Sequence, residues 1–163
     1  MNPAAPGTSR PTAGSEATRL QLVTFRLGDE VYGLPIGHVR EIIGAHRPTR
    51  LPGAVRHVAG LINLRGEVIP VFRLRTWFDL KDEVPATSST IIAEWRGERF
   101  GFQVDAVQQV VWLDKAQIDP PTSQFQQKAP HISGLGKHEG RLIILLDLDA
   151  LFRDSEDDAA GLG

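Results

Sequence analysis

Residues 58–78 have the sequence V-A-G-L-I-N-L-R-G-E-V-I-P-V-F-R-L-R-T-W-F, and this stretch decides the fold. Two apolar runs rich in β-branched residues flank the link Arg65-Gly66-Glu67. Such runs around a short glycine-containing link predict a β-hairpin, in which Gly66 supplies the positive φ of the turn. Pro70 cannot donate a ladder hydrogen bond, so we expect it at a sheet edge or a bulge. The turn would lift one cation, Arg65, out of an apolar hairpin.

Apolar segments on both sides of the hairpin predict further short strands, over residues 20–27, 31–34, 46–51 (an edge strand), 90–95, 99–104, 107–113, 132–135 and 142–146. The polar, proline-containing stretches 81–89 and 119–129 predict exposed loops, and a second group of strands starts after the first of them. About ten short strands in two groups predict an all-β fold built of small barrels rather than a parallel α/β fold.

Helical pieces are predicted to be few and short. Val39, Ile42 and Ile43 fall at i, i+3 and i+4, which is the spacing of a one-sided helix. A further turn or short helix is expected at residues 77–80, against a barrel end. Asp147 can cap a last short helix.

The chain has 163 residues, enough for one domain with a real core. Residues 1–19 are rich in small residues and proline, and residues 154–163 are acidic, so both are expected to be disordered tails around a domain at 20–153. No apolar run approaches the roughly 18 residues of a membrane span, and the first residues lack the pattern of a signal peptide. Because the chain also has no cysteine, we expect a cytoplasmic protein.

Charge is distributed unevenly along the chain. Residues 40–75 carry seven arginines and two glutamates, a net of +5, whereas residues 76–163 carry 8 bases and 15 acids, a net of −7. Such asymmetry is informative about partners and orientation rather than about the fold.

Motifs for catalysis or cofactor binding are missing from the sequence. The five histidines lack the i, i+4 spacing of a helical metal site, and there is no phosphate-binding loop, no dinucleotide fingerprint and no nucleophile elbow. Asp147 and Asp149 form a pair of acids, but a helix start explains them. We therefore expect a protein that is not an enzyme and that has no metal and no cofactor.

Nucleic-acid binding is a rival hypothesis, because small barrels often bind nucleic acid and residues 40–75 are basic. Stacking platforms require exposed aromatic side chains among the basic ones. Most of the 11 aromatic residues fall on strand positions expected to be buried, so protein binding is favoured over nucleic acid.

Several blocks in a fixed order resemble the CheW-like chemotaxis coupling proteins: F-R-L-G-D-E-V-Y-G-L-P-I at 25–36, H-V-R-E-I at 38–42, A-G-L-I-N-L-R-G-E-V-I-P-V-F-R-L-R at 59–75, S-G-L-G at 133–136 and R-L-I-I-L-L-D-L-D-A-L at 141–151. The resemblance covers residues 20–152. Arg73 departs from it, because the family commonly has Asp before the final L-R. Any contact that needs an acid at this position is therefore in doubt.

The resemblance implies two packed, intertwined five-stranded SH3-like barrels. It also implies a non-catalytic adaptor that couples the cytoplasmic tip of transmembrane chemoreceptors, a helical hairpin, to the regulatory domain of a chemotaxis histidine kinase. The receptor tip would lie in an apolar groove between the barrels, and the adaptor would join membrane arrays only through its partners. An adaptor for another output, such as pilus motility, shares every feature of the sequence. The positions that match the family's contact residues are Val39, Glu41, Gly60 and Arg65.

Each of these positions also has a purely structural interpretation. Arg65 could be a solvated turn cation, and Gly60 a bulge or a point of close backbone packing. Val39 and Glu41 could be the buried and solvated sides of an amphipathic helix. Asn63 is expected to bond the local backbone and shape the turn.

Overall fold

The computed structural model describes residues 18–153, except residues 45, 55, 82, 84 and 152 and the side chains of residues 125, 126 and 128. The tails predicted at 1–19 and 154–163 therefore lie outside the described residues, apart from residues 18 and 19. The elements are β1 Arg19–Leu27, β2 Glu30–Pro35, η1 Ile36–His38, β3 Val39–Ile43, β4 Val58–Leu64, β5 Glu67–Arg73, α2 Leu74–Trp77, β6 Ser89–Trp95, β7 Glu98–Val104, β8 Ala106–Asp114, η2 Lys115–Gln117, β9 Ile118–Asp119, α3 Ser123–Lys128, β10 Ile132–His138 and β11 Arg141–Leu146.

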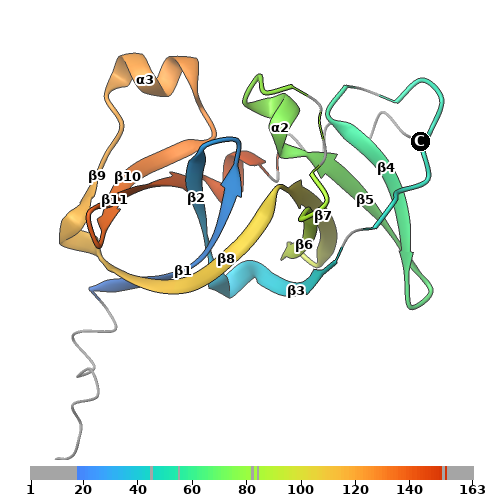
Figure 1. Ribbon diagram of the computed structural model, residues 1–163, viewed down its shortest axis with the longest axis horizontal. Coiled ribbons are helices and arrows are strands. Elements are labelled where there is room, and N and C mark those ends of the chain that lie inside the picture. The colour runs from blue at the N-terminus through green and yellow to red at the C-terminus, as the bar shows by residue number, and fades with distance from the viewer. Residues whose placement is uncertain are drawn as a thin grey trace, which may run out of the picture.

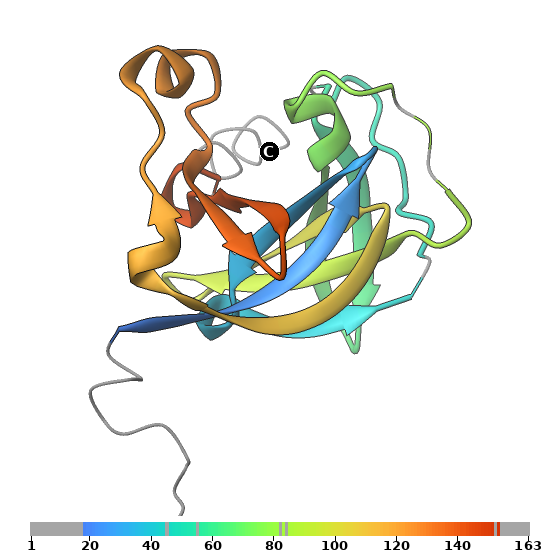
Figure 2. The same cartoon turned by 60° about the vertical axis from the view of Figure 1, so that its left-hand side comes forward.

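The strands form two sheets that lie side by side (Figures 1 and 2). One sheet has six strands in the order β8-β1-β2-β11-β10-β9, and the other has five in the order β3-β6-β7-β5-β4. The mostly β architecture in two packed sheets confirms the predicted fold class. The larger sheet exceeds the expected five strands because the two-residue strand β9 pairs at its edge.

The two sheets do not follow the division of the chain at the 81–89 loop. Strands β1 and β2 pair with strands from the last third of the chain, and the middle of the chain forms the other sheet. Two parallel pairings, β2 with β11 and β5 with β7, bring these distant segments together. Such long-range pairing leaves no local signal in the sequence, so the sequence did not predict which strands share a sheet.

Three apolar clusters form the core. The largest lies between the sheets, because it draws on β1 and β2 from one sheet and on β5, β6 and β7 from the other, and its fully buried rings are Phe25, Phe72 and Phe102. A smaller cluster around Leu22 and Leu113 consists of side chains of the six-stranded sheet, and another around Ile69 and Ile92 consists of side chains of the five-stranded sheet. Joint burial of apolar side chains therefore holds the two sheets together as one unit.

The predicted hairpin is confirmed as β4 and β5, which pair antiparallel from Val58–Phe72 to Leu64–Glu67. Both turn residues have a positive φ, 51° at Arg65 and 87° at Gly66, which is the two-residue turn that matches the twist of a hairpin. The left-handed conformation of Arg65 was not predicted. Arg96-Gly97 turns the β6–β7 hairpin in the same way, with φ of 52° and 79°.

Two predicted elements differ in the structure. The helix predicted from the spacing of Val39, Ile42 and Ile43 is wrong: Val39–Ile43 is the strand β3, in which Val39, Glu41 and Ile43 are half-buried and Ile42 is exposed. Its pairing with β6 outweighs an apolar spacing that is too short to specify a helix. The edge strand predicted at 46–51 is reduced, among its described residues, to a single bridge between Thr49 and Leu61.

Of three further local predictions, those for the 119–129 loop and for Pro70 differ from the structure, and the one for the Asp147 cap is confirmed. The predicted loop at 119–129 contains the short helix α3. Pro70 lies in β5, an inner strand, rather than at an edge; pairing with β7 begins only at Val71, so no ladder bond needs the missing amide of Pro70. The helix cap at Asp147 is confirmed, because its Oδ1 accepts a hydrogen bond from the Ala150 amide at 3.2 Å.

Candidate functional site

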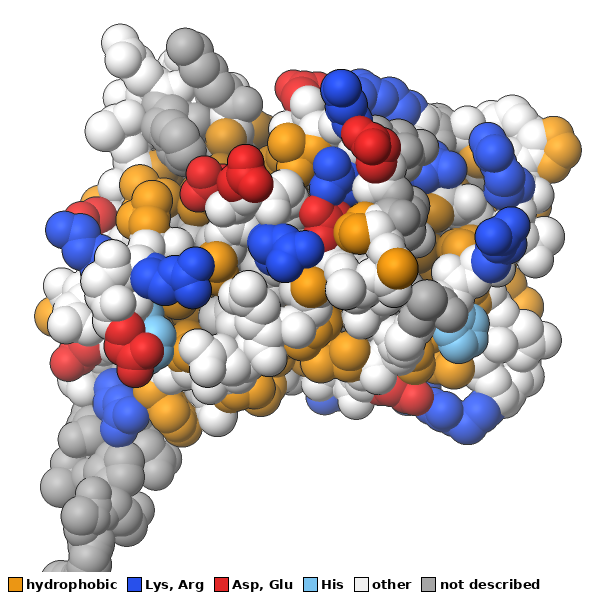
Figure 3. Space-filling model, viewed as in Figure 1, with side chains coloured by type: hydrophobic (Ala, Val, Ile, Leu, Met, Phe, Trp, Pro, Cys, Tyr) orange, Lys and Arg blue, Asp and Glu red, His pale blue; other side chains and the backbone are white. Residues whose placement is uncertain are grey.

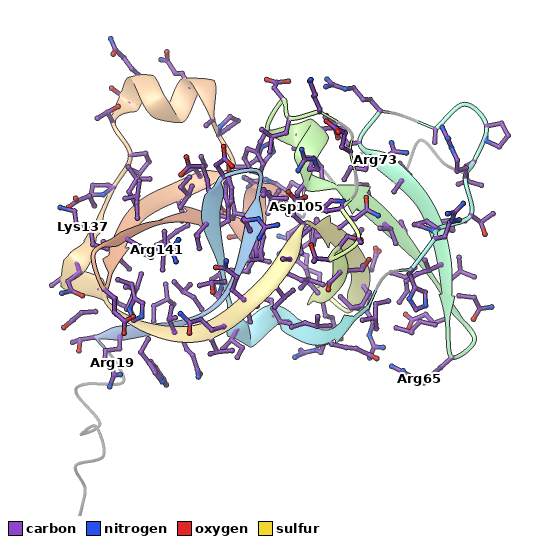
Figure 4. The ribbon with its side chains drawn as sticks, in the orientation of Figure 1. Arg19, Arg65, Arg73, Asp105, Lys137 and Arg141 are labelled. Carbon is purple, nitrogen blue, oxygen red and sulfur yellow. The ribbon has the colours of Figure 1, made fainter. Side chains whose placement is uncertain are left out.

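The tip of the β4–β5 hairpin presents Arg65 at the lower right of the molecule (Figure 4). Asn63 shapes this turn, since its Oδ1 accepts a hydrogen bond from the Gly66 amide at 2.9 Å, which confirms its predicted role. The turn fixes the backbone, and the long side chain of Arg65 remains largely exposed, at 65%.

The Arg65 guanidinium forms a two-pronged ion pair with Glu41. Its Nη1 donates to Glu41 Oε2 at 3.0 Å, and its Nη2 donates to Oε1. Glu41 lies on β3, at one edge of the five-stranded sheet, and the hairpin forms the other edge. The ion pair therefore joins the two edges of the curled sheet. The hydrogen bond from Arg65 lowers the pKa of Glu41, and the same bond raises the pKa of Arg65.

Further ion pairs continue across the same sheet. Arg99 contacts Glu67 at 3.2 Å and Glu94 at 3.4 Å, and Glu94 also pairs with Arg40 at 3.1 Å. The hydrogen bond from Arg40 is the main cause of a lowered pKa at Glu94. Each of these side chains is partly exposed, so the network orients charges on a surface and adds little stability.

Exposed apolar side chains accompany this ion pair on both of its elements. Ile42, which follows Glu41 in β3, is 44% exposed, and Val68, at the start of β5, is 60% exposed. Exposed apolar side chains and arginine are both found in protein-binding surfaces, and these two elements carry both.

The other two predicted contact residues have a different setting. Val39 is half-buried on β3 and packs against the core between the sheets. Gly60 is buried, with a φ of 147°, and a Cβ at this position would lie 2.3 Å from the Thr49 carbonyl oxygen. The structure brings Glu41 and Arg65 into contact. Gly60 makes a close backbone approach to Thr49 and also follows a β-bulge in β4, so both structural interpretations of Gly60 hold.

Arg73 lies at the opposite end of the hairpin from Arg65 (Figure 4). Its Nη1 donates hydrogen bonds to the carbonyl oxygens of Arg56 at 2.9 Å and Val58 at 3.1 Å. Arg73 thus ties the end of β5 to the segment that leads into β4.

A buried ion pair that sequence reasoning missed connects the two sheets. Asp105 follows β7, and its Oδ2 accepts hydrogen bonds from Arg75 and, at 2.8 Å, from the amide of Gly28 in the β1–β2 turn. The Asp105 side chain is 5% exposed and that of Arg75 is 17% exposed. Because the partners are 30 and 77 residues apart in sequence, no local pattern could have revealed the contact.

Two features are missing from the residues that the structure describes. No group of three or more His, Cys, Asp or Glu residues is placed to hold a metal ion. No helix in this part of the chain is long and apolar enough to cross a membrane.

Two packed sheets with charged and apolar contact surfaces define the class of protein: a β-rich interaction module. Comparison with known proteins identifies the family. A model of the CheW-like domain matches residues 21–156, so the chain belongs to the CheW-like domain family.

Relatives support this assignment over most of the chain. The probable chemotaxis protein CheW of Rhizobium etli is 33% identical over 142 residues, which are 86% of this chain and 92% of the relative. Chemotaxis protein CheW of Helicobacter pylori is 30% identical and covers 82% of each chain. The crystal structure of the scaffolding protein TtCheW from Thermoanaerobacter tengcongensis has a TM-score of 0.73 at 34% identity, and the match covers 78% of this chain and 88% of that one.

Proposed function

We propose that this protein is a non-catalytic adaptor that couples transmembrane chemoreceptors to a chemotaxis-type sensor histidine kinase in a bacterial signalling array. The match to the CheW-like domain over residues 21–156 carries this proposal. Two sheets held as one unit by a shared core offer separate faces, so a small protein can hold two partners at a fixed geometry.

The receptor contact is assigned to the surface where β3 meets the tip of the β4–β5 hairpin. The exposed Ile42 and Val68 supply apolar area, and the Glu41–Arg65 pair supplies orientation. A helical hairpin at the receptor tip fits such a surface by laying an apolar stripe against it, with polar groups at its rim. Val39 lies on the same strand as Glu41, whereas Gly60 lies farther from the hairpin tip, against Thr49.

Substitution of Arg65 tests this assignment. Arg65→Ala should bind a receptor cytoplasmic fragment several-fold more weakly, because truncating an interface anchor commonly costs more than about 1 kcal/mol of binding. Its melting temperature should change little, since substitutions of exposed residues usually stay within about 0.5 kcal/mol. Arg65→Glu should bind more weakly still, because it sets two acids, Glu41 and the new side chain, against each other. Calorimetric titration of the receptor fragment and of the kinase regulatory domain, with thermal melts, provides both quantities.

Arg96→Ala is the matched control. Arg96 has the same turn position and positive φ in the neighbouring hairpin, and its guanidinium lies 4.4 Å from the Trp95 ring centre rather than on an acid. If both substitutions weaken binding equally, or if Arg65→Ala lowers the melting temperature by many degrees, the site assignment is wrong.

An adaptor for pilus motility or another output would have the same surfaces. Capture of partners from the native cells, with this protein as bait, distinguishes these pathways, because the identity of the captured receptors and kinase differs between them.

A further inference from the structure

Two adjoining cavities of about 370 and 550 Å³ open where β4 begins and β5 ends. They share Arg50, Ala59 and Arg73 as lining residues, so together they form one depression. We call this depression the arginine trough; its basic lining residues are Arg47, Arg50, Arg56, Arg73 and Lys81.

Every charged side chain among the described residues that line the trough is basic. In the described part of the chain, no carboxylate pairs with Arg47 or Arg50, and the acid that contacts Arg56, Asp79, is 4.0 Å away and 91% exposed. Lys and Arg side chains are visible on this upper right-hand part of the surface (Figure 3). Like charges gathered in a depression create a positive potential that attracts an anionic ligand.

The trough is held by backbone contacts rather than by mobile side chains alone. Thr49 exchanges two hydrogen bonds with Leu61, at 2.7 and 2.9 Å, which fixes the segment between Arg47 and Arg50 against the edge strand β4. On the other side, Arg73 is bound to the carbonyl oxygens of Arg56 and Val58. The positive charges therefore have fixed backbone positions before any ligand binds.

The composition of the trough selects the kind of anion. None of its described lining residues is Phe, Tyr or Trp, so it offers no stacking platform for nucleic-acid bases. Leu51, Ala54 and Val58 provide apolar surface between the cations. Guanidinium groups bind carboxylates with two parallel hydrogen bonds, and a site beside an edge strand such as β4 suits an extended peptide.

We propose that the arginine trough binds an acidic peptide segment of a partner protein, with its carboxylates on Arg47 and Arg50. The trough lies at the opposite end of the β4–β5 hairpin from Arg65, so this contact is separate from the proposed receptor surface (Figure 4). The inference does not depend on the proposed function.

Fluorescence anisotropy of the full chain with a labelled peptide of alternating Glu and Ser tests the proposal. The double substitution Arg47→Gln/Arg50→Gln should weaken binding roughly tenfold or more, since each lost charge-assisted contact is worth more than about 1 kcal/mol. Its melting temperature should be unchanged because both side chains are exposed. The matched control is Lys137→Gln/Arg141→Gln, which removes the same charge from the far side of the molecule (Figure 4) and should leave the affinity within about twofold.

Four results would overturn the proposal. One is equal binding of a Gln-Ser peptide, and another is an equal loss in both double variants, which would indicate net charge alone. A third is tighter binding of oligothymidylate at the same arginines, which would make the trough a nucleic-acid site. The fourth is a large gain in peptide affinity when the four acids at 154, 156, 157 and 158 are changed to amides, which would make the chain's own tail the occupant.

Discussion

Arg65 is held by a partner in the structure, although its place in a turn suggests a solvated side chain. In the sequence it is a turn cation, which is usually solvated, but in the structure both guanidinium nitrogens at its end are bound to Glu41. An arginine held by two hydrogen bonds presents a fixed planar surface to a partner, so less side-chain entropy is lost on binding. The same pairing orients Glu41, which makes both residues part of one surface.

The titration of Glu41 provides a test of this ion pair. Its pKa is lowered from the usual 4.5 by the Arg65 hydrogen bond, so the pairing is fully present above that value and is lost as the pH falls through the lowered pKa. Arg65→Ala should return the pKa of Glu41 upward toward 4.5, which NMR titration of the side-chain carboxyl measures. Glu94 is the internal control, because Arg40 is its main partner. An unchanged Glu41 pKa would show that the pair does not form in solution.

At the scale of elements, the β4–β5 hairpin depends on a turn whose two residues both adopt a left-handed conformation. Nothing lies within 4 Å of a Cβ placed on Gly66, so a substitution there tests backbone strain without a clash. Gly66→Val should destabilise the protein by about 1–2 kcal/mol in urea unfolding, and Gly66→Asn by less, because Asn tolerates this conformation.

Gly44→Val is the control for this prediction. Gly44 also has open space around it but no positive φ, so Val there should cost little. If the two valine substitutions prove equally costly, the turn conformation is not what Gly66 contributes.

The conformation of β3 is decided by its pairing with a neighbouring strand. Its sequence V-R-E-I-I has the apolar spacing of a helix, but five residues are too few to specify one. Pairing with β6 makes this segment a strand, and it turns Glu41 toward Arg65 and Ile42 toward solvent. The interaction surface therefore depends on a strand that local propensity did not identify.

For the molecule as a whole, Asp105 is the polar link between the two sheets. It binds the β1–β2 turn of one sheet through Gly28 and, through Arg75, the helix α2 that follows β5 of the other. Asp105→Ala should destabilise the protein by about 3 kcal/mol, because it leaves a largely buried guanidinium without its carboxylate. Urea unfolding measures this difference.

Glu67→Gln is the comparison for that prediction, since it breaks the exposed Arg99–Glu67 pair, whose side chains are 37% and 50% exposed. It should cost no more than about 0.5 kcal/mol. Equal losses from the two substitutions would mean that the buried pair does not couple the sheets.

Much of the architecture follows from the sequence alone. The β class, the central hairpin, the positive φ at Gly66, the turn bond of Asn63 and the cap at Asp147 are all local, because each depends on residues a few positions apart. The ordered sequence blocks also indicated the family, which the match over residues 21–156 confirms.

The contacts between distant segments became visible only in the folded structure. The parallel pairings that form the two sheets, the Glu41–Arg65 contact and the Arg75–Asp105 contact join residues 24 or more positions apart. Pairing across such distances is selected by burial in a shared core and by the geometry of the whole sheet, and neither is encoded in a short window of sequence. The same is true of the arginine trough, whose basic residues come from separate loops and strand ends that gather only when the chain folds.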